Sequence, residues 1–237
     1  MDVTRYRLPL RFDAARLQAD LAVADASVWQ PHFHKEDFAG DWRGVALRSA
    51  SGRADDLLAH PLAASEYRPT PLLEQCHYFA AVIAKLALTL RGARLLSLGP
   101  GSQILPHRDR GLAYRFGEAR LHIPIVSGAA VEFRVAGEPV VMAPGECWYL
   151  DLDQEHSVVN RGHERRVHLV LDAVRDERCD QWLAGAEMAP REAGHGIGAG
   201  SGDAMDEALR RQVLGQLLRR DDDTSRALAA SIQASLQ

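Results

Sequence analysis

The sequence predicts a mainly β fold, a sandwich or a small barrel such as a jelly roll, and three observations lead to that prediction. Between residues 94 and 175, short runs of strand-forming residues follow one another at close spacing. Turn residues separate these runs, for example at Pro100-Gly101 and Pro144-Gly145. Hydrophobic residues make up 46% of the 237 residues, which is enough for a sizeable core.

The N-terminal part, residues 1–93, is predicted to be an α/β region that precedes this core. We expect a short strand at Tyr6–Leu10 and, from its alternating pattern, another at Trp42–Arg48. Apolar residues repeat at helical spacing in several further segments. The expected helices lie at Asp13–Val23, Pro71–Gln75 and His77–Leu90.

The core itself is expected at about residues 94–175, within one folded domain that spans 1–189. Its strands are predicted from short runs rich in β-branched, aromatic and other apolar residues. They lie at Leu95–Leu98, Arg120–Val126, Val131–Val135, Pro139–Met142, Cys147–Leu150, Ser157–Asn160 and Arg166–Ala173.

The C-terminal part differs in composition from the rest. Residues 190–202 are predicted to be a flexible linker, because Gly recurs at every second position from 194 to 202. Residues 203–237 are predicted to form a helical tail of two segments, in which apolar residues recur four positions apart. Both helices need a partner surface. A helical hairpin on the same subunit and a homodimer contact through these helices both remain open.

Charge and composition narrow the class of protein. The formal net charge is −4 at pH 7, which argues against non-specific nucleic-acid binding. The three cysteines are widely spaced and form no C-x-x-C pair, so we expect neither a disulfide framework nor a zinc ribbon. The N-terminus has no apolar stretch of a signal peptide. The longest apolar run, Phe79–Leu90, is about half as long as a membrane-spanning helix. We therefore expect a cytoplasmic protein with no membrane partner.

The strongest signal for function is the ordered set His107, Asp109 and His156. On an extended segment, residues two apart point to the same face, so His107 and Asp109 can reach one metal ion. A His-x-Asp pair alone is more often found on a surface without a metal ion. The presence of His156, 49 positions after His107, favours a metal site over that interpretation. Two imidazoles and one carboxylate bind iron(II) on one face and leave the other face open. The set therefore predicts the catalytic ligands of an iron(II) ion.

Arg166, ten positions after His156, predicts a site for a carboxylate on a second ligand. Its guanidinium is always charged and presents a planar fork that matches a carboxylate. A hairpin centred near Arg161 places His156 and Arg166 directly opposite each other. Opposite residues of an antiparallel pair share a face, so the two side chains are expected to point into the same cavity.

Arg120 and His122 share one face of their expected strand, and the apolar residues between them share the other. A buried Arg and His need partners, because unpaired charge in a core is costly. A small dicarboxylate is one such partner. A structural ion pair with an acidic side chain such as Asp109 or Glu146 is the alternative, and both remain open.

These residues lie in segments that resemble the aspartyl/asparaginyl β-hydroxylase family, to which bacterial free-proline hydroxylases are similar. The segments are Ser97–Asp109, Arg120–His122, Gly145–Asp151 and His156–Asp172. The resemblance covers about residues 80–175, and the ordered spacing of the motifs makes it specific. Members of this family are iron(II)- and 2-oxoglutarate-dependent oxygenases.

The resemblance implies that the core is a double-stranded β-helix, a jelly roll of the cupin type. The N-terminal helices and the C-terminal helical tail, which are expected from apolar periodicity alone, would flank this core. It implies that His107, Asp109 and His156 hold the iron. Arg166 is then expected to pair with the distal carboxylate of 2-oxoglutarate. His122, together with Arg120, is expected to contact the carboxylate near the metal or the substrate.

The implied reaction is hydroxylation of an unactivated C–H bond of an amino acid, a peptide residue or a related carboxylate. It uses O2 and 2-oxoglutarate and releases succinate and CO2. The mammalian aspartyl hydroxylase type has Gly where this chain has Asp109, whereas the free-amino-acid hydroxylases keep all three ligands, as this chain does. Trp42, Arg48 and Arg120 are candidates for the substrate side, although packing and surface roles are commoner for Trp and Arg.

Two other classes of protein remain open. One is a non-catalytic module that binds a small molecule on a cupin barrel, and the other is a cupin metalloenzyme that does not use 2-oxoglutarate. Fold alone does not distinguish them, because such barrels host many functions. The intact set of three metal ligands followed by Arg166 favours the oxygenase. The expected partner is a carboxylate-bearing small molecule or peptide.

Overall fold

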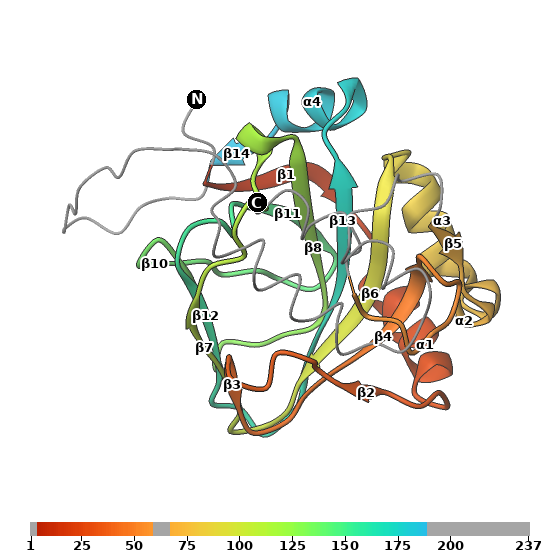
Figure 1. Ribbon diagram of the computed structural model, residues 1–237, viewed down its shortest axis with the longest axis vertical. Coiled ribbons are helices and arrows are strands. Elements are labelled where there is room, and N and C mark those ends of the chain that lie inside the picture. Colours follow the sequence, from red (N-terminus) through yellow and green to blue (C-terminus); the bar gives the residue numbers. More distant parts are fainter. Residues whose placement is uncertain (1–3, 59–66, 189–237) are drawn as a thin grey trace, which may run out of the picture. The chain divides into compact units, whose positions relative to one another are not determined.

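The computed structural model describes residues 4–58 and 67–188, and these residues form a mainly β protein, as predicted. Two antiparallel sheets make up most of the structure (Figure 1). The predicted linker at 190–202 and the predicted helical tail at 203–237 lie outside the described residues.

The larger sheet has the strand order β14-β1-β11-β8-β13-β6-β4-β2, and β5 pairs with β4. Its strands are β1 (Arg5–Arg11), β2 (Gln30–Pro31), β4 (Trp42–Ser49), β5 (Arg68–Pro69), β6 (Leu90–Leu98), β8 (Glu118–Val126), β11 (Glu146–Leu150), β13 (Arg166–Val174) and β14 (Glu187–Met188). The smaller sheet has the order β10-β9-β12-β7-β3. Its strands are β3 (Phe38–Ala39), β7 (Gln103–His107), β9 (Val131–Val135), β10 (Glu138–Pro139) and β12 (His156–Asn160).

Helices cover one face of the larger sheet (Figure 1). The helices are α1 (Ala14–Ala24), α2 (Pro71–Gln75), α3 (His77–Leu86) and α4 (Glu177–Ala184), and a 3-10 turn lies at Tyr114–Phe116. Asp13 begins α1, because its carboxylate accepts a hydrogen bond from the backbone N–H of Arg16 at 3.1 Å. None of the described helices is long and apolar enough to cross a bilayer.

Strand β13 shows how the sequence divides the interior into two cores. Val167, Leu169 and Leu171 pack in one buried cluster with residues of α1 and α3. Successive side chains of a strand point to opposite faces. The alternate residues, Arg166, His168, Val170 and Asp172, therefore point toward the space between the two sheets. Val170 belongs to the second buried apolar cluster there.

Several predicted boundaries were wrong, and the strand expected at Leu95–Leu98 begins at Leu90. The helix expected to reach Leu90 ends at Leu86, because Ala87 adopts a left-handed conformation with φ of 51° and β6 begins at Leu90. The strand expected at Pro139–Met142 is confined to β10, since residues 140–142 leave the sheet. Alternating leucines fit a helix end and a strand start equally well, so the pattern did not distinguish them.

The predicted hairpin between His156 and Arg166 was also wrong. β12 pairs with β7 and β9 in the smaller sheet, whereas β13 pairs with β6 and β8 in the larger one. Asn160 forms the corner between them. Its side-chain amide donates to the carbonyl oxygens of Leu98, Gly99 and Glu164 at 3.0, 3.1 and 2.8 Å. These bonds hold the end of β12 against β6, so the chain crosses to the other sheet instead of turning back.

Candidate metal centre

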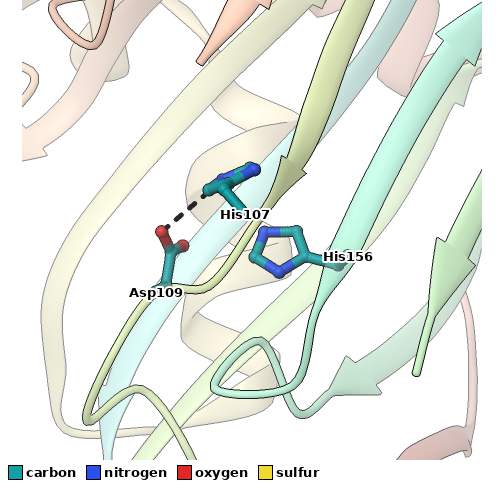
Figure 2. Close-up of side chains that lie close together, drawn as sticks. All are labelled: His107, Asp109 and His156. Carbon is teal, nitrogen blue, oxygen red and sulfur yellow. Dashed lines mark ion pairs between the residues drawn. The ribbon is translucent and has the colours of Figure 1, made fainter. Parts of the chain in front are cut away.

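His107, Asp109 and His156 come together where β7 ends and β12 begins (Figure 2). The two histidines are paired across these neighbouring strands, with ring centroids 4.2 Å apart. Asp109 follows β7, and Nε2 of His107 lies 3.7 Å from its Oδ1. One ligand atom from each of the three residues lies within 4.8 Å of the others. The structure therefore gathers the set that the spacing predicted, in a geometry that one metal ion can bridge.

The backbone orients both imidazoles. Nδ1 of His107 lies 2.8 Å from the carbonyl oxygen of Leu105, and Nδ1 of His156 lies 3.0 Å from that of Gln154. A carbonyl oxygen only accepts, so each Nδ1 carries the proton and each Nε2 keeps a free lone pair. Metal-binding histidines usually have such a partner on the other nitrogen. Burial lowers the pKa of His156 to about 4, which keeps this ring neutral and able to bind a metal at pH 7.

Asp109 is tied to a chain of buried charges. Nη1 of Arg120 donates to its Oδ2 at 2.6 Å, and Nε of Arg120 donates to Oδ1 of Asp172 at 2.5 Å. The other oxygen of Asp172 accepts from Arg94. Burial opposes ionisation of Asp109, but Arg120 and the neighbouring His156 and His107 together outweigh it, and the pKa of Asp109 lies below its usual value. Asp109 is thus ionised with Oδ1 directed at His107.

Of the two partners left open for Arg120, the ion pair with Asp109 is the one present. Because Asp172 holds the same guanidinium from the other side, Arg120 is committed to two carboxylates of the protein itself. Fewer N–H groups of Arg120 are therefore free for the contact with a ligand carboxylate that the sequence indicated. Arg120 instead orients the candidate metal ligand Asp109.

Arg166 is buried, with 2% of its surface exposed. Among the described residues no carboxylate forms an ion pair with its guanidinium. Its Nη2 donates to Nδ1 of His168 at 2.7 Å, and its guanidinium carbon lies 5.6 Å from the ring centre of Phe133. Burial lowers its pKa to about 9, so Arg166 remains charged at pH 7.

His122 lies beside His168, the hydrogen-bond partner of this arginine. Its Nδ1 is 3.5 Å from Nδ1 of His168, and its buried Nε2 has no hydrogen-bond partner within residues 4–58 and 67–188. Burial lowers the pKa of His122 well below its usual value, and the positive charges of Arg166 and then Arg120 lower it further. His122 is therefore neutral.

The two weaker candidates have different surroundings. Trp42 is buried and stacks on His32 with ring centroids 3.4 Å apart. Burial lowers the pKa of His32 to about 2, and the positive charge of Arg94 lowers it further. Arg48 is half-buried and takes no part in the chain of charges around Asp172.

Three residues that complete this site were not singled out from the sequence: Arg94, His168 and Asp172. All three are buried. His168 and Asp172 continue the two-residue alternation that begins at Arg166 on β13. Polar residues at every second position of an otherwise apolar strand were the available signal, because a buried strand that lines no site is usually apolar on both faces.

A mainly β fold with two histidines and one carboxylate on adjoining strands defines a candidate metal-binding β-sheet protein. The aspartyl/asparaginyl beta-hydroxylase family profile matches residues 11–176. The chain belongs to this family, which confirms the resemblance seen in its motifs.

Two curated relatives and one solved structure illustrate the match. L-proline cis-3-hydroxylase 1 from Streptomyces sp is 29% identical over 186 residues, which cover 75% of this chain and 62% of that protein. L-proline cis-4-hydroxylase from Rhizobium meliloti (strain 1021) is 25% identical over 174 residues, which cover 71% and 60%. The chain thus spans only 60–62% of the length of these relatives. The solved structure is an oxidoreductase of the 2OG-Fe(II) oxygenase family from Burkholderia pseudomallei, which is 16% identical with a TM-score of 0.50. The match covers 73% of this chain and 86% of that chain, and it supports the fold.

Proposed function

We propose that the protein is an iron(II)- and 2-oxoglutarate-dependent dioxygenase that hydroxylates an unactivated C–H bond of a free amino acid or a related carboxylate. 2-Oxoglutarate and O2 are its cosubstrates, and succinate and CO2 are released. The proline hydroxylases among the relatives favour a free amino acid over a peptide residue. The two antiparallel sheets support a double-stranded β-helix as the scaffold.

The observation that carries the proposal is the unpaired charge of Arg166. A charge in a protein interior needs a partner, because its desolvation is costly. The described residues supply Arg166 with a neutral imidazole and an aromatic ring but with no carboxylate. An anionic ligand that enters the space between the sheets would provide the missing partner, and a carboxylate fits the guanidinium fork best.

The position of Arg166 relative to the metal ligands fits a short dicarboxylate. Phe133, which lies beside Arg166, is two residues from Val135 on β9, and Val135 is paired with the metal ligand His156. Two residues of a strand span about 7 Å. A ligand with a carboxylate at each end of a five-carbon chain can therefore meet the metal ligands and Arg166 together.

The donor set suits iron(II). Two neutral imidazoles and one carboxylate are the ligands of non-haem iron(II) oxygenases, and they leave positions open for other ligands. His107, Asp109 and His156 would hold the ion, and bound iron(II) with 2-oxoglutarate and O2 supplies the oxidising power. The residues of the chain bind and orient: Arg120 fixes Asp109, and Arg166 receives the distal carboxylate.

An anaerobic titration tests this proposal directly. Iron(II) and then 2-oxoglutarate are added to the metal-free protein while the visible spectrum is recorded. A metal-to-ligand charge-transfer band that forms on addition of 2-oxoglutarate supports the proposal. Iron binding without the band would favour a cupin metalloenzyme of another kind, and failure to bind iron would favour a non-catalytic binding module.

Replacement of Arg166 by Ala provides the matched variant. We expect Arg166→Ala to bind iron(II) as the wild type does but to need at least about 100-fold more 2-oxoglutarate for half of the band, since it lacks a charge-assisted bidentate pair. An unchanged 2-oxoglutarate requirement would remove Arg166 from this role. Product analysis with free amino acids, beginning with proline, then identifies the substrate.

A further inference from the structure

We infer that His168 is a positioning residue, which orients the guanidinium of Arg166 for the incoming carboxylate while leaving its charge unpaired. The inference rests on the proposed function, because it concerns how the distal carboxylate of 2-oxoglutarate is received. His168 lies two residues beyond Arg166 on β13, so both side chains point into the space between the sheets.

The contact fixes the protonation of His168. Nη2 of Arg166 lies 2.7 Å from Nδ1 of His168. Because a guanidinium only donates, Nδ1 of His168 must carry the lone pair and Nε2 the proton. Burial lowers the pKa of His168 well below its usual value, and the positive charge of Arg166 lowers it further. His168 is therefore a neutral hydrogen-bond acceptor.

A neutral acceptor suits this position better than a carboxylate would. A Glu or Asp beside Arg166 would orient the guanidinium but would also neutralise it, and 2-oxoglutarate would then have to displace that pair. An imidazole accepts from one of the five N–H groups of Arg166 and leaves four for a ligand, more than a bidentate carboxylate needs. His168 thus holds the guanidinium of Arg166 in one orientation and does not weaken its attraction for an anion.

The surroundings of His168 support an orienting role. Its ring is 1% exposed, and its Nδ1 also faces Nδ1 of His122 at 3.5 Å. Phe133 lies beside the same guanidinium, with its ring centre 5.6 Å from the guanidinium carbon of Arg166. A buried side chain held by packing and by a hydrogen bond loses little further freedom when the ligand binds, which favours affinity.

Three variants of His168 separate orientation from packing. His168→Asn keeps an acceptor near the position of Nδ1, His168→Leu removes it at similar size, and His168→Asp adds a competing negative charge. Calorimetry measures binding of 2-oxoglutarate to protein loaded with Mn(II), which is not oxidised during the experiment. We expect Asn to bind within about threefold of wild type, Leu about tenfold more weakly and Asp more weakly still. Thermal unfolding confirms that each variant is folded.

2-Oxopentanoate provides the control ligand, because it has a methyl group in place of the distal carboxylate. If His168 acts through Arg166, the affinity for 2-oxopentanoate is the same in wild type and His168→Leu. If the substitution disturbs the whole cavity, both ligands weaken together, and the inference is overturned. An equal affinity of wild type and His168→Leu for 2-oxoglutarate also overturns it.

The same measurements distinguish failure of this inference from failure of the proposed function. Wild-type protein that does not bind 2-oxoglutarate, or that binds it equally well after Arg166→Ala, contradicts the proposed function itself. Wild-type protein that binds 2-oxoglutarate through Arg166, but whose affinity does not respond to His168→Leu, contradicts only the role of His168.

Discussion

At the scale of single residues, the two oxygens of Asp109 have different partners. Arg120 holds Oδ2, and Oδ1 points to His107. This division leaves one oxygen for the metal and prevents rotation of the carboxylate. Residues that orient metal ligands in this way typically change metal affinity by about 10- to 100-fold when replaced.

We therefore predict that Arg120→Met weakens binding of iron(II) by about tenfold or more, because Asp109 loses the partner that orients it. Anaerobic titration with iron(II) measures the dissociation constant. Arg53→Met is the matched control, since Arg53 pairs with Asp55 on an exposed surface. Equal metal affinity of the two variants would show that Asp109 needs no orientation by Arg120.

The site could be predicted from the sequence in part. Spacing alone indicated His107, Asp109 and His156, because His-x-Asp and one later His form a recognisable order. The chain of charges around Asp172 could not be predicted. Its two arginines lie 78 and 52 residues before it in the sequence, and strand pairing alone brings them together. No local pattern specifies such partners.

At the scale of elements, β12 and β13 were predicted as strands and are strands, but their pairing was not as predicted. Alternation of side chains determines which face of a strand is buried, and it does not say which strand lies beside it. The corner at Asn160 decides the pairing through three side-chain hydrogen bonds. The two faces of β13 follow from alternation, because they depend only on the strand itself.

The turn before β11 depends on a single glycine. Gly145 has φ of +81°, and a Cβ placed on it would lie 2.2 Å from the backbone oxygen of Phe12. The same glycine accepts a hydrogen bond from the N–H of Phe12 at 2.8 Å, which joins β1 to β11. A side chain here would push these two strands apart.

We predict that Gly145→Ala destabilises the protein by at least about 3 kcal/mol, the sum of backbone strain at positive φ and a steric clash with backbone. Gly137→Ala is the control, because Gly137 also has positive φ, +79°, but a Cβ there meets nothing within 4 Å. It should cost about 1–2 kcal/mol. Urea unfolding measures both, and equal losses would mean that the turn adapts to the extra methyl group.

At the scale of the whole molecule, the space between the two sheets combines an apolar cluster with buried polar groups. Leu98, Phe133 and Val158 belong to the apolar part, whereas His122 and the arginines around it form the polar part. The mainly β class could be predicted because many short strands leave a clear trace in composition. The arrangement of the polar part could not, because it depends on both sheets together.

Four buried histidines make the stability of the metal-free protein depend on pH. Burial lowers the pKa of His32 to about 2 and that of His156 to about 4, and it lowers the pKa values of His122 and His168 well below 6.5. In the unfolded chain each histidine returns to about 6.5. Below that pH the unfolded state binds more protons than the folded state, so stability falls as the pH falls.

We predict that the metal-free protein loses about 5–6 kcal/mol of stability per pH unit below about pH 6, since each of the four histidines contributes about 1.4 kcal/mol per unit. Urea unfolding at a series of pH values between about 7 and 5 measures the slope. His168→Asn should reduce it by about one quarter, because one proton-binding site of the unfolded chain is gone. Replacement of the exposed His77 by Gln changes no buried group and should leave the slope as it is. If His168→Asn and wild type show the same slope, protonation of His168 does not limit stability, and this histidine is not held neutral by the fold.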